Sequence, residues 1–152
     1  MDVIEEILRH QETANELQNA GSDEGSRVLR AHLERILDAL HEDCAEVIGT
    51  IVSGVDGMAW AQRLPAEFDQ NRFAAMSSAL LALSDNLVRE AGKGSPRKVL
   101  IEGEDGNVFL MHAGNRLLLT VFTRADSNLG MSLAHANHAV DQIAALMARC
   151  ET

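Results

Sequence analysis

Residues 47–65, VIGTIVSGVDGMAWAQRLP, decide the fold class because two apolar runs flank a short run of turn-forming residues. Residues 47–52 are rich in β-branched side chains, which favour a strand. Residues 53–57 include two glycines and an aspartate, which tolerate the positive φ of tight turns. A second strand is expected over residues 58–64, ended by Pro65. The segment is therefore predicted to be a β-hairpin.

The glycines of this hairpin suggest a phosphate-binding loop as the alternative. Loops of that kind follow the pattern G-x-x-x-x-G-K-[ST] or G-x-G-x-x-G and lead from a strand into a helix, whose N-terminus binds the anion. Here the loop leads into a second strand and contains no lysine. A turn is the favoured interpretation.

Apolar residues at helical spacing predict amphipathic helices near both ends of the chain. The first is expected over residues 3–17, and the polar residues 21–26 separate it from a second helix whose N-cap is Ser22 or Ser26. The apolar stripe of the second helix is Leu29, Leu33, Ile36 and Leu40. The last helix is expected to pack on the sheet through Leu129, Leu133, Ala136, Val140, Ile143 and Met147.

The helix that follows Asp69 is expected to be buried on two sides. Its large apolar residues are expected to face the sheet, and they are Phe73, Met76, Leu80, Leu83 and Leu87. Residues 73–84 include no charged residue, so the remaining surface of the helix also lacks the charges of a solvated face. Small residues allow close helix packing, which makes the same helix of a second copy the economical partner.

Three more strands are expected over residues 98–102, 108–113 and 116–123, joined by turns at residues 104–107 and 114–115. The element order is then α-β-β-α-β-β-β-α with an extra N-terminal helix. This order predicts an α/β protein of the α+β type, with a five-stranded antiparallel sheet and helices on both faces. We expect an N-terminal helix and linker over residues 1–26 and one domain over residues 27–150.

Composition excludes several classes of partner. The chain has 152 residues and a formal net charge of −10, with no dense basic run, so neither nucleic acid nor an anionic membrane surface is an expected partner. The N-terminus is acidic where a signal peptide is basic, and no apolar run is long enough for membrane insertion, so a cytoplasmic location is expected. Cys44 and Cys150 are expected to be reduced thiols.

No pattern for catalysis or metal binding is complete. Residues 95–98 match S-x-x-K and residues 84–86 match S-D-N, but their order is reversed and no K-T-G follows. His135 and His138 are three residues apart without a full ligand set, and His112 has no neighbouring nucleophile in the sequence. We therefore expect no catalytic residue, metal or cofactor, and a protein that is not an enzyme.

With this element order, the sequence resembles the roadblock family, which comprises small domains related to a dynein light chain and to bacterial partners of Ras-like GTPases. Profilin-like domains share much of the architecture. The resemblance covers roughly residues 28–147. It is carried by residues 47–57, the alanine-rich helix from Asp69, residues 98–101, residues 114–119 and Asn128-Leu-Gly130.

The resemblance implies a homodimer in which the central helices pack antiparallel and the strand from Lys98 pairs with its twin. It also implies a scaffold or regulator that binds a Ras-like small GTPase across the paired helices and sometimes stimulates GTP hydrolysis. Expected dimer-interface residues are Ala75, Ser78, Ala79, Ala82, Val99 and Ile101. Expected partner-binding residues are Ala74, Leu81 and Asp85.

Two other functions remain open from the sequence. A small-ligand sensor or enzyme of profilin-like fold would have a pocket with convergent polar groups between the sheet and a helix. A structural subunit of a larger assembly would share the charge-poor surface of a scaffold.

Overall fold

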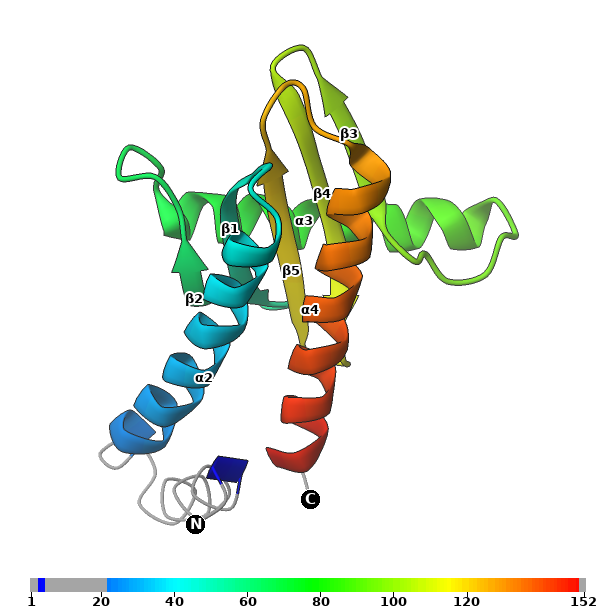
Figure 1. Ribbon diagram of the computed structural model, residues 1–152. Coiled ribbons are helices and arrows are strands. Elements are labelled where there is room, and N and C mark those ends of the chain that lie inside the picture. Colours follow the sequence, from blue (N-terminus) through cyan, green and yellow to red (C-terminus); the bar gives the residue numbers. More distant parts are fainter. Residues whose placement is uncertain (1–2, 5–21, 151–152) are drawn as a thin grey trace.

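The computed structural model describes residues 3–4 and 22–150, which form one antiparallel sheet with helices on both faces (Figure 1). The α+β fold and the element order are as expected. The elements are α2 (Ser22–Asp43), β1 (Val47–Gly54), β2 (Ala59–Arg63), α3 (Gln70–Glu90), β3 (Val99–Gly103), β4 (Gly106–Ala113), β5 (Leu117–Thr123) and α4 (Leu129–Cys150). Apart from Val3 and Ile4, the predicted N-terminal helix lies outside the described residues, and α2 begins inside the predicted linker.

The strand order is β2-β1-β5-β4-β3, and every neighbouring pair is antiparallel. The predicted hairpin at residues 47–65 is confirmed, with Gly57 at a φ of 88° in its turn. Its first strand pairs with β5 across a long stretch of sequence, with Ile51 opposite Thr120. Strands β2 and β3 are therefore the two edges of the sheet.

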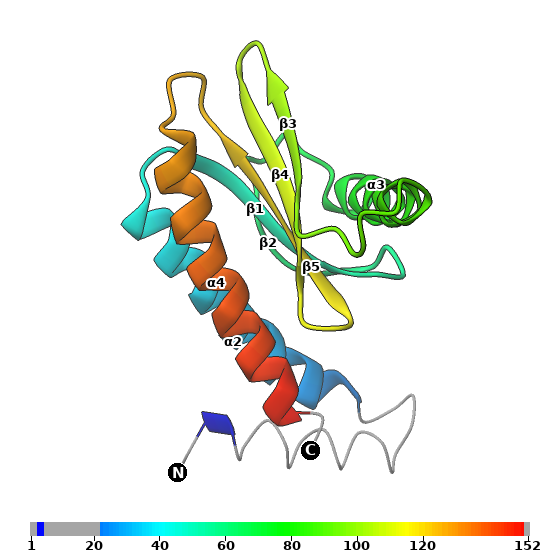
Figure 2. The same cartoon turned by 90° about the vertical axis from the view of Figure 1, so that its right-hand side faces the viewer.

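The three helices form two layers on opposite faces of the sheet. Helices α2 and α4 lie side by side on one face, and α3 lies alone on the other and crosses the strands (Figures 1 and 2). The larger core lies beneath α2 and α4, where Leu33, Phe109 and Ile143 are fully buried. Burial of side chains of this size contributes roughly 1.5–3 kcal/mol each, so this layer supplies most of the apolar stabilisation.

The core beneath α3 is smaller and partly polar. Leu81 packs against Leu110 and Leu118, and the buried Thr120 hydroxyl donates a 2.9 Å hydrogen bond to Ser77 Oγ. This face of the sheet carries hydroxyl groups. Small residues of α3 allow the helix to approach them closely enough to form a direct hydrogen bond. The residues of α3 that are buried are Ala74, Ser77 and Leu81.

The predicted sheet-facing stripe of α3 is therefore wrong for three of its five residues, whereas Phe73 contacts Phe122 and Leu80 packs against the smaller core. Met76, Leu83 and Leu87 have exposed fractions of 56%, 65% and 69%. The prediction took the largest apolar residues for the core, whereas the close approach of the helix to the sheet selects small ones. The true stripe is turned around the helix axis by about one residue, which corresponds to about 100°.

The N-cap of helix α4 is Asn128, whose Oδ1 accepts from the Met131 N–H (3.2 Å), and a carboxylate that lies far away in sequence supports it. Glu46, between α2 and β1, accepts hydrogen bonds from the Asn128 backbone N–H (2.8 Å) and the Ser132 hydroxyl (3.0 Å). The first N–H groups of a helix have no partner within the helix, and a negative charge there is also favoured by the helix dipole. Glu46 thus joins α4 to the start of β1.

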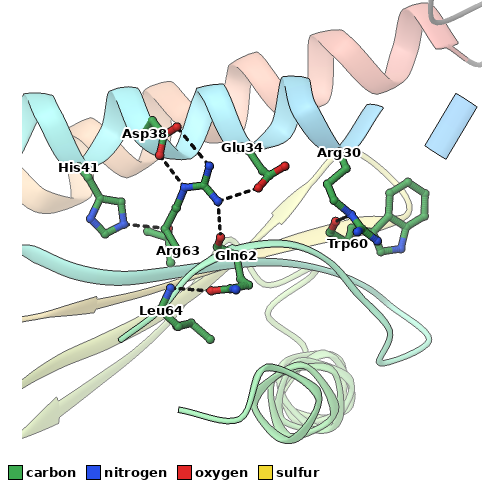
Figure 3. Close-up of polar contacts among 9 residues, drawn as sticks. Arg30, Glu34, Asp38, His41, Trp60, Gln62, Arg63 and Leu64 are labelled. Atoms are coloured by element: carbon green, nitrogen blue, oxygen red, sulfur yellow. Dashed lines mark hydrogen bonds and ion pairs between the residues drawn. The ribbon is translucent and has the colours of Figure 1, made fainter. Parts of the chain in front are cut away.

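Arg63 on β2 holds α2 over the edge of the sheet (Figure 3). Its guanidinium donates hydrogen bonds to Asp38 (2.6 Å) and Glu34 (2.7 Å) of α2. The bond from Arg63 lowers the pKa of Asp38. Nearby, His41 Nε2 lies 3.0 Å from Thr50 Oγ1, and burial lowers the pKa of His41.

Glu46→Gln should reduce the free energy of unfolding by about 1–2 kcal/mol, because the acceptor at the start of α4 loses its charge. Urea denaturation measures this. Glu42→Gln, on the exposed end of α2, is the matched control and should leave stability nearly unchanged. Equal stability of both variants would contradict the role of Glu46.

Stability should fall as the pH falls below about 6.5, in part because of His41. Its pKa is lower in the folded state, so in this range the unfolded chain binds more protons and is favoured. His41→Gln should flatten the dependence of the unfolding free energy on pH. The exposed His138→Gln should not, and identical profiles for the two variants would disprove the assignment.

Candidate interaction site on helix α3 and strand β3

Helix α3 runs across the sheet and extends past its β3 edge (Figure 1). Viewed along the helix axis in Figure 2, it lies on the side opposite to α2 and α4. Its C-terminal turns therefore have no strand of this chain beneath them. A helix in that position exposes surface that is normally covered by a sheet.

The exposed large residues of α3 lie along one side of the helix. Met76, Leu83 and Leu87 are separated by seven and four residues, a spacing that places them on one stripe. Leu80 lies between them, half-buried, and packs against the smaller core, as Val108 of β4 also does. The stripe therefore continues from the helix onto the sheet.

Strand β3 extends this apolar surface. Ile101 lies opposite Val108 in the β3–β4 register and is 42% exposed. Residues opposite each other in an antiparallel pair share a face, so Ile101 lies on the α3 side of the sheet. We call Met76, Leu80, Leu83, Leu87 and Ile101 the α3–β3 patch. Monomeric proteins seldom expose a continuous apolar surface that spans two elements.

The outer edge of β3 is open among the residues that the structure describes. The strand pairs with β4 from Val99 opposite Leu110 to Gly103 opposite Gly106. No side chain of the described ranges, 3–4 and 22–150, is hydrogen bonded to the backbone of β3. An edge with unpaired N–H and C=O groups is a template for another strand.

The other side of α3 is covered by the turn of the β1–β2 hairpin. The Ser78 hydroxyl donates a hydrogen bond to the Val55 carbonyl. Gly57 lies so close that a Cβ on it would be 3.6 Å from the Ala75 Cα. The hairpin turn thus supports α3. This packing accounts for Gly57 in the turn, so no phosphate-binding role is needed to explain the glycine.

The residues predicted for interfaces fall into three groups. Ala75, Ala79 and Ala82 are exposed on the outer side of α3, beside the α3–β3 patch. Ser78 is half-buried by its bond to the hairpin turn. On β3, Ile101 is exposed and Val99 is partly buried against the smaller core.

The three predicted partner-binding residues turn toward the sheet of their own chain rather than toward solvent. Ala74 and Leu81 have exposed fractions of 0% and 3% and pack against the sheet of their own chain, so they offer no surface to a partner. Asp85 also turns toward the sheet, where its Oδ1 is buried 3.6 Å from His112 Nε2. This correction follows from the rotation of the helix described above.

Sequence reasoning missed Met76, Leu83 and Leu87 as surface residues. The uncharged run at residues 73–84 indicated that a partner covers a second side of helix α3. It did not indicate which residues form that side. The hydroxyls of Ser53 and Thr120 could have indicated it, because a sheet face with such residues packs best against alanine and serine.

Other features of the described chain lie away from the α3–β3 patch. Described residues include no group of three or more histidine, cysteine or carboxylate side chains placed to hold a metal. A cavity of about 590 Å³ lies between α2 and α4, beside Ile36 and Leu146, on the face of the sheet opposite to α3. Cys44 and Cys150 are both buried. None of the helices described here is both long and apolar enough to span a bilayer.

Known proteins are similar to this chain in sequence and in fold. Uncharacterized protein MJ0310 of Methanocaldococcus jannaschii is 32% identical over 114 residues, which cover 75% of this chain and 98% of that protein. Myxococcus xanthus MglB has a TM-score of 0.73 at 17% identity, over 78% of this chain and 89% of its own. A Roadblock/LC7 domain from Streptomyces avermitillis has a TM-score of 0.58 at 27% identity, over 72% and 96%.

The family assignment rests on the greater part of the sequence. The sequence model of the Roadblock/LC7 domain matches residues 34–123, from the middle of α2 to the end of β5. These residues include the hairpin, α3 and the open strand β3. The chain therefore belongs to the Roadblock/LC7 domain family.

Proposed function

We propose that this chain is a homodimeric scaffold that binds and regulates a Ras-like small GTPase. The observation that carries the proposal is the α3–β3 patch, an apolar surface on α3 and β3. It lies next to the open edge of β3, and the C-terminal turns of α3 extend past that edge. Each of these features needs a partner, and one partner meets all three needs.

A second copy of this chain is that partner. Two copies of β3 related by a twofold axis pair antiparallel and join the two sheets into one. The partner's sheet then lies beneath the overhanging turns of α3, next to Leu83 and Leu87. The same axis brings the two α3 helices together, antiparallel, along their exposed apolar stripes.

The GTPase is proposed to bind on the outer side of the paired helices. Ala75, Ala79 and Ala82 face outward there, and the run of residues 73–84 contributes no charge from either copy. A wide surface of low charge suits a protein partner rather than a small ligand. Membership of the roadblock family, whose resemblance implies GTPase partners, supports this choice.

The chain is proposed to act on its partner's own hydrolysis without supplying catalytic groups. A GTPase carries its phosphate-binding loop and magnesium site itself, so a bound scaffold changes the rate by positioning the partner's groups. Stimulation of GTP hydrolysis is therefore the activity to measure.

A small-ligand sensor is the weaker alternative. It requires a pocket between the sheet and a helix with convergent polar groups. Beneath α3, small residues and a direct Ser77–Thr120 bond fill that space. A structural subunit would share the dimer, and the GTPase experiment below separates it from a regulator.

Leu83→Lys should convert the dimer into a folded monomer. The side chain is exposed in one copy, so the lone chain tolerates the charge, whereas the paired helices would bury it. The dissociation constant should rise at least a hundredfold, or about 2.8 kcal/mol. Light scattering and circular dichroism measure mass and folding.

Met131→Lys is the matched control, because Met131 is similarly exposed but lies on α4, in the opposite layer. It should remain a dimer. A Leu83→Lys protein that keeps the mass of wild type would place the interface elsewhere.

Ala79→Arg should weaken binding of the GTPase at least tenfold while the dimer persists. The test mixes the purified protein with Ras-like GTPases from its own source, loaded with GDP or a GTP analogue, and follows mass and hydrolysis rate. Ala134→Arg on α4 is the control and should bind like wild type. Loss of the dimer in Ala79→Arg would instead assign Ala79 to the copy–copy contact.

A further inference from the structure

The second edge of the sheet, strand β2, differs from β3 in a way that affects assembly. Side chains are hydrogen bonded to its backbone at Trp60 and Gln62, and to the backbone of Leu64 just after the strand (Figure 3). Arg30 Nε donates to the Trp60 carbonyl (3.2 Å), Arg63 Nη1 donates to the Gln62 carbonyl (3.0 Å), and the Leu64 N–H donates to Gln62 Oε1 (2.7 Å). We call these three contacts the β2 caps.

The β2 caps occupy the groups that a further strand would need. Gln62 and Leu64 lie at alternate positions, and backbone groups at alternate positions of a strand point to the same side. Trp60 lies at the irregularity of the β1–β2 register, between Ala59 opposite Ser53 and Ala61 opposite Val52. Since β2 has a strand neighbour only at β1 within residues 22–150, its remaining backbone groups have no ladder partner there. Side chains supply the missing bonds in place of another strand.

Two of the capping side chains come from positions that the fold holds in place. Arg63 is fixed by Glu34 and Asp38, which receive its other hydrogen bonds from α2. Arg30 reaches Trp60 from α2 itself, the helix that covers β2. The caps are therefore properties of the α2 layer, whereas the helix that passes the β3 edge is α3, on the opposite face of the sheet (Figure 2).

We propose that the β2 caps close this edge to strand pairing, so that assembly through the sheet stops at two copies. The proposal rests on the proposed dimer at β3. A chain with one open edge forms a closed twofold pair, whereas a chain with two open edges continues into an open-ended array. Arg30, Gln62 and Arg63 thus determine the size of the assembly.

The test opens the edge without breaking the Arg63 contacts to α2. Arg30→Ala/Gln62→Val removes two caps and places a strand-forming residue on β2. Arg27→Ala/Gln142→Val makes the same changes at exposed sites away from the edge. Light scattering across a range of concentrations, with thermal unfolding of the same samples, reports assembly and folding.

Wild type and the control should remain dimers at all concentrations, and the cap variant should form species at least twice the mass of the dimer. Arg30→Ala/Gln62→Lys should stay a dimer, because an edge lysine opposes pairing even without the caps. Larger species that also form with lysine would come from unfolding and would overturn the proposal.

A folded cap variant that remains a dimer at high concentration would overturn the proposal while the proposed function stands. A monomeric wild type and a dimeric cap variant would support closure of β2 and remove the β3 dimer. Should the double variant fail to fold, Gln62→Val alone opens the Leu64 N–H. The Gln62→Val variant should then show a smaller increase in mass. A folded Gln62→Val protein with the mass of wild type would contradict the closing role of the β2 caps.

Discussion

The pairing of β1 with β5 is the constraint on which the rest of the structure depends. It joins the β1–β2 hairpin to the three-stranded meander and makes one sheet of two local units. It also fixes which residues face each layer, because successive residues of a strand point to opposite faces. Val52 enters the larger core beneath α2 and α4, while the next residue, Ser53, lies beneath α3. A slip of one residue would exchange the two environments.

The two faces of the sheet then lead to different surfaces. The apolar face takes two helices, and one of them, α2, covers β2 and ties it through Arg63. The smaller, more polar face takes a single helix that approaches closely and crosses the strands. A helix seated on its small residues must carry its large ones at the side, which is why Met76, Leu83 and Leu87 are exposed. The candidate site is thus a consequence of how α3 packs.

The sequence was sufficient for the order of strands and helices because local patterns decide it, whereas the pairing of β1 with β5 is long-range. The turns at residues 53–57, 104–107 and 114–115 depend on neighbours in sequence, and the strands and helices follow as expected. The rotation of α3 depends on the opposing sheet face, where Ser53 and Thr120 meet Ser77, and no single-element pattern reports it. The caps on β2 likewise join residues about 30 positions apart, as Arg30 and Trp60 are.

The seat of α3 has a consequence for the motions of the protein. Two oxygens beneath it are buried without a hydrogen bond: Ser53 Oγ, and Asp85 Oδ1, which has only His112 Nε2 at 3.6 Å, and the apolar cluster that holds the helix is small. Unsatisfied buried acceptors oppose burial, so water gains more by entering this layer than the core under α2 and α4. Local opening, and with it exchange of backbone hydrogens, therefore begins at α3. A second subunit that covers α3 would slow that opening. The rate of hydrogen exchange in α3, the most exposed helix, would then depend on whether the subunit is bound.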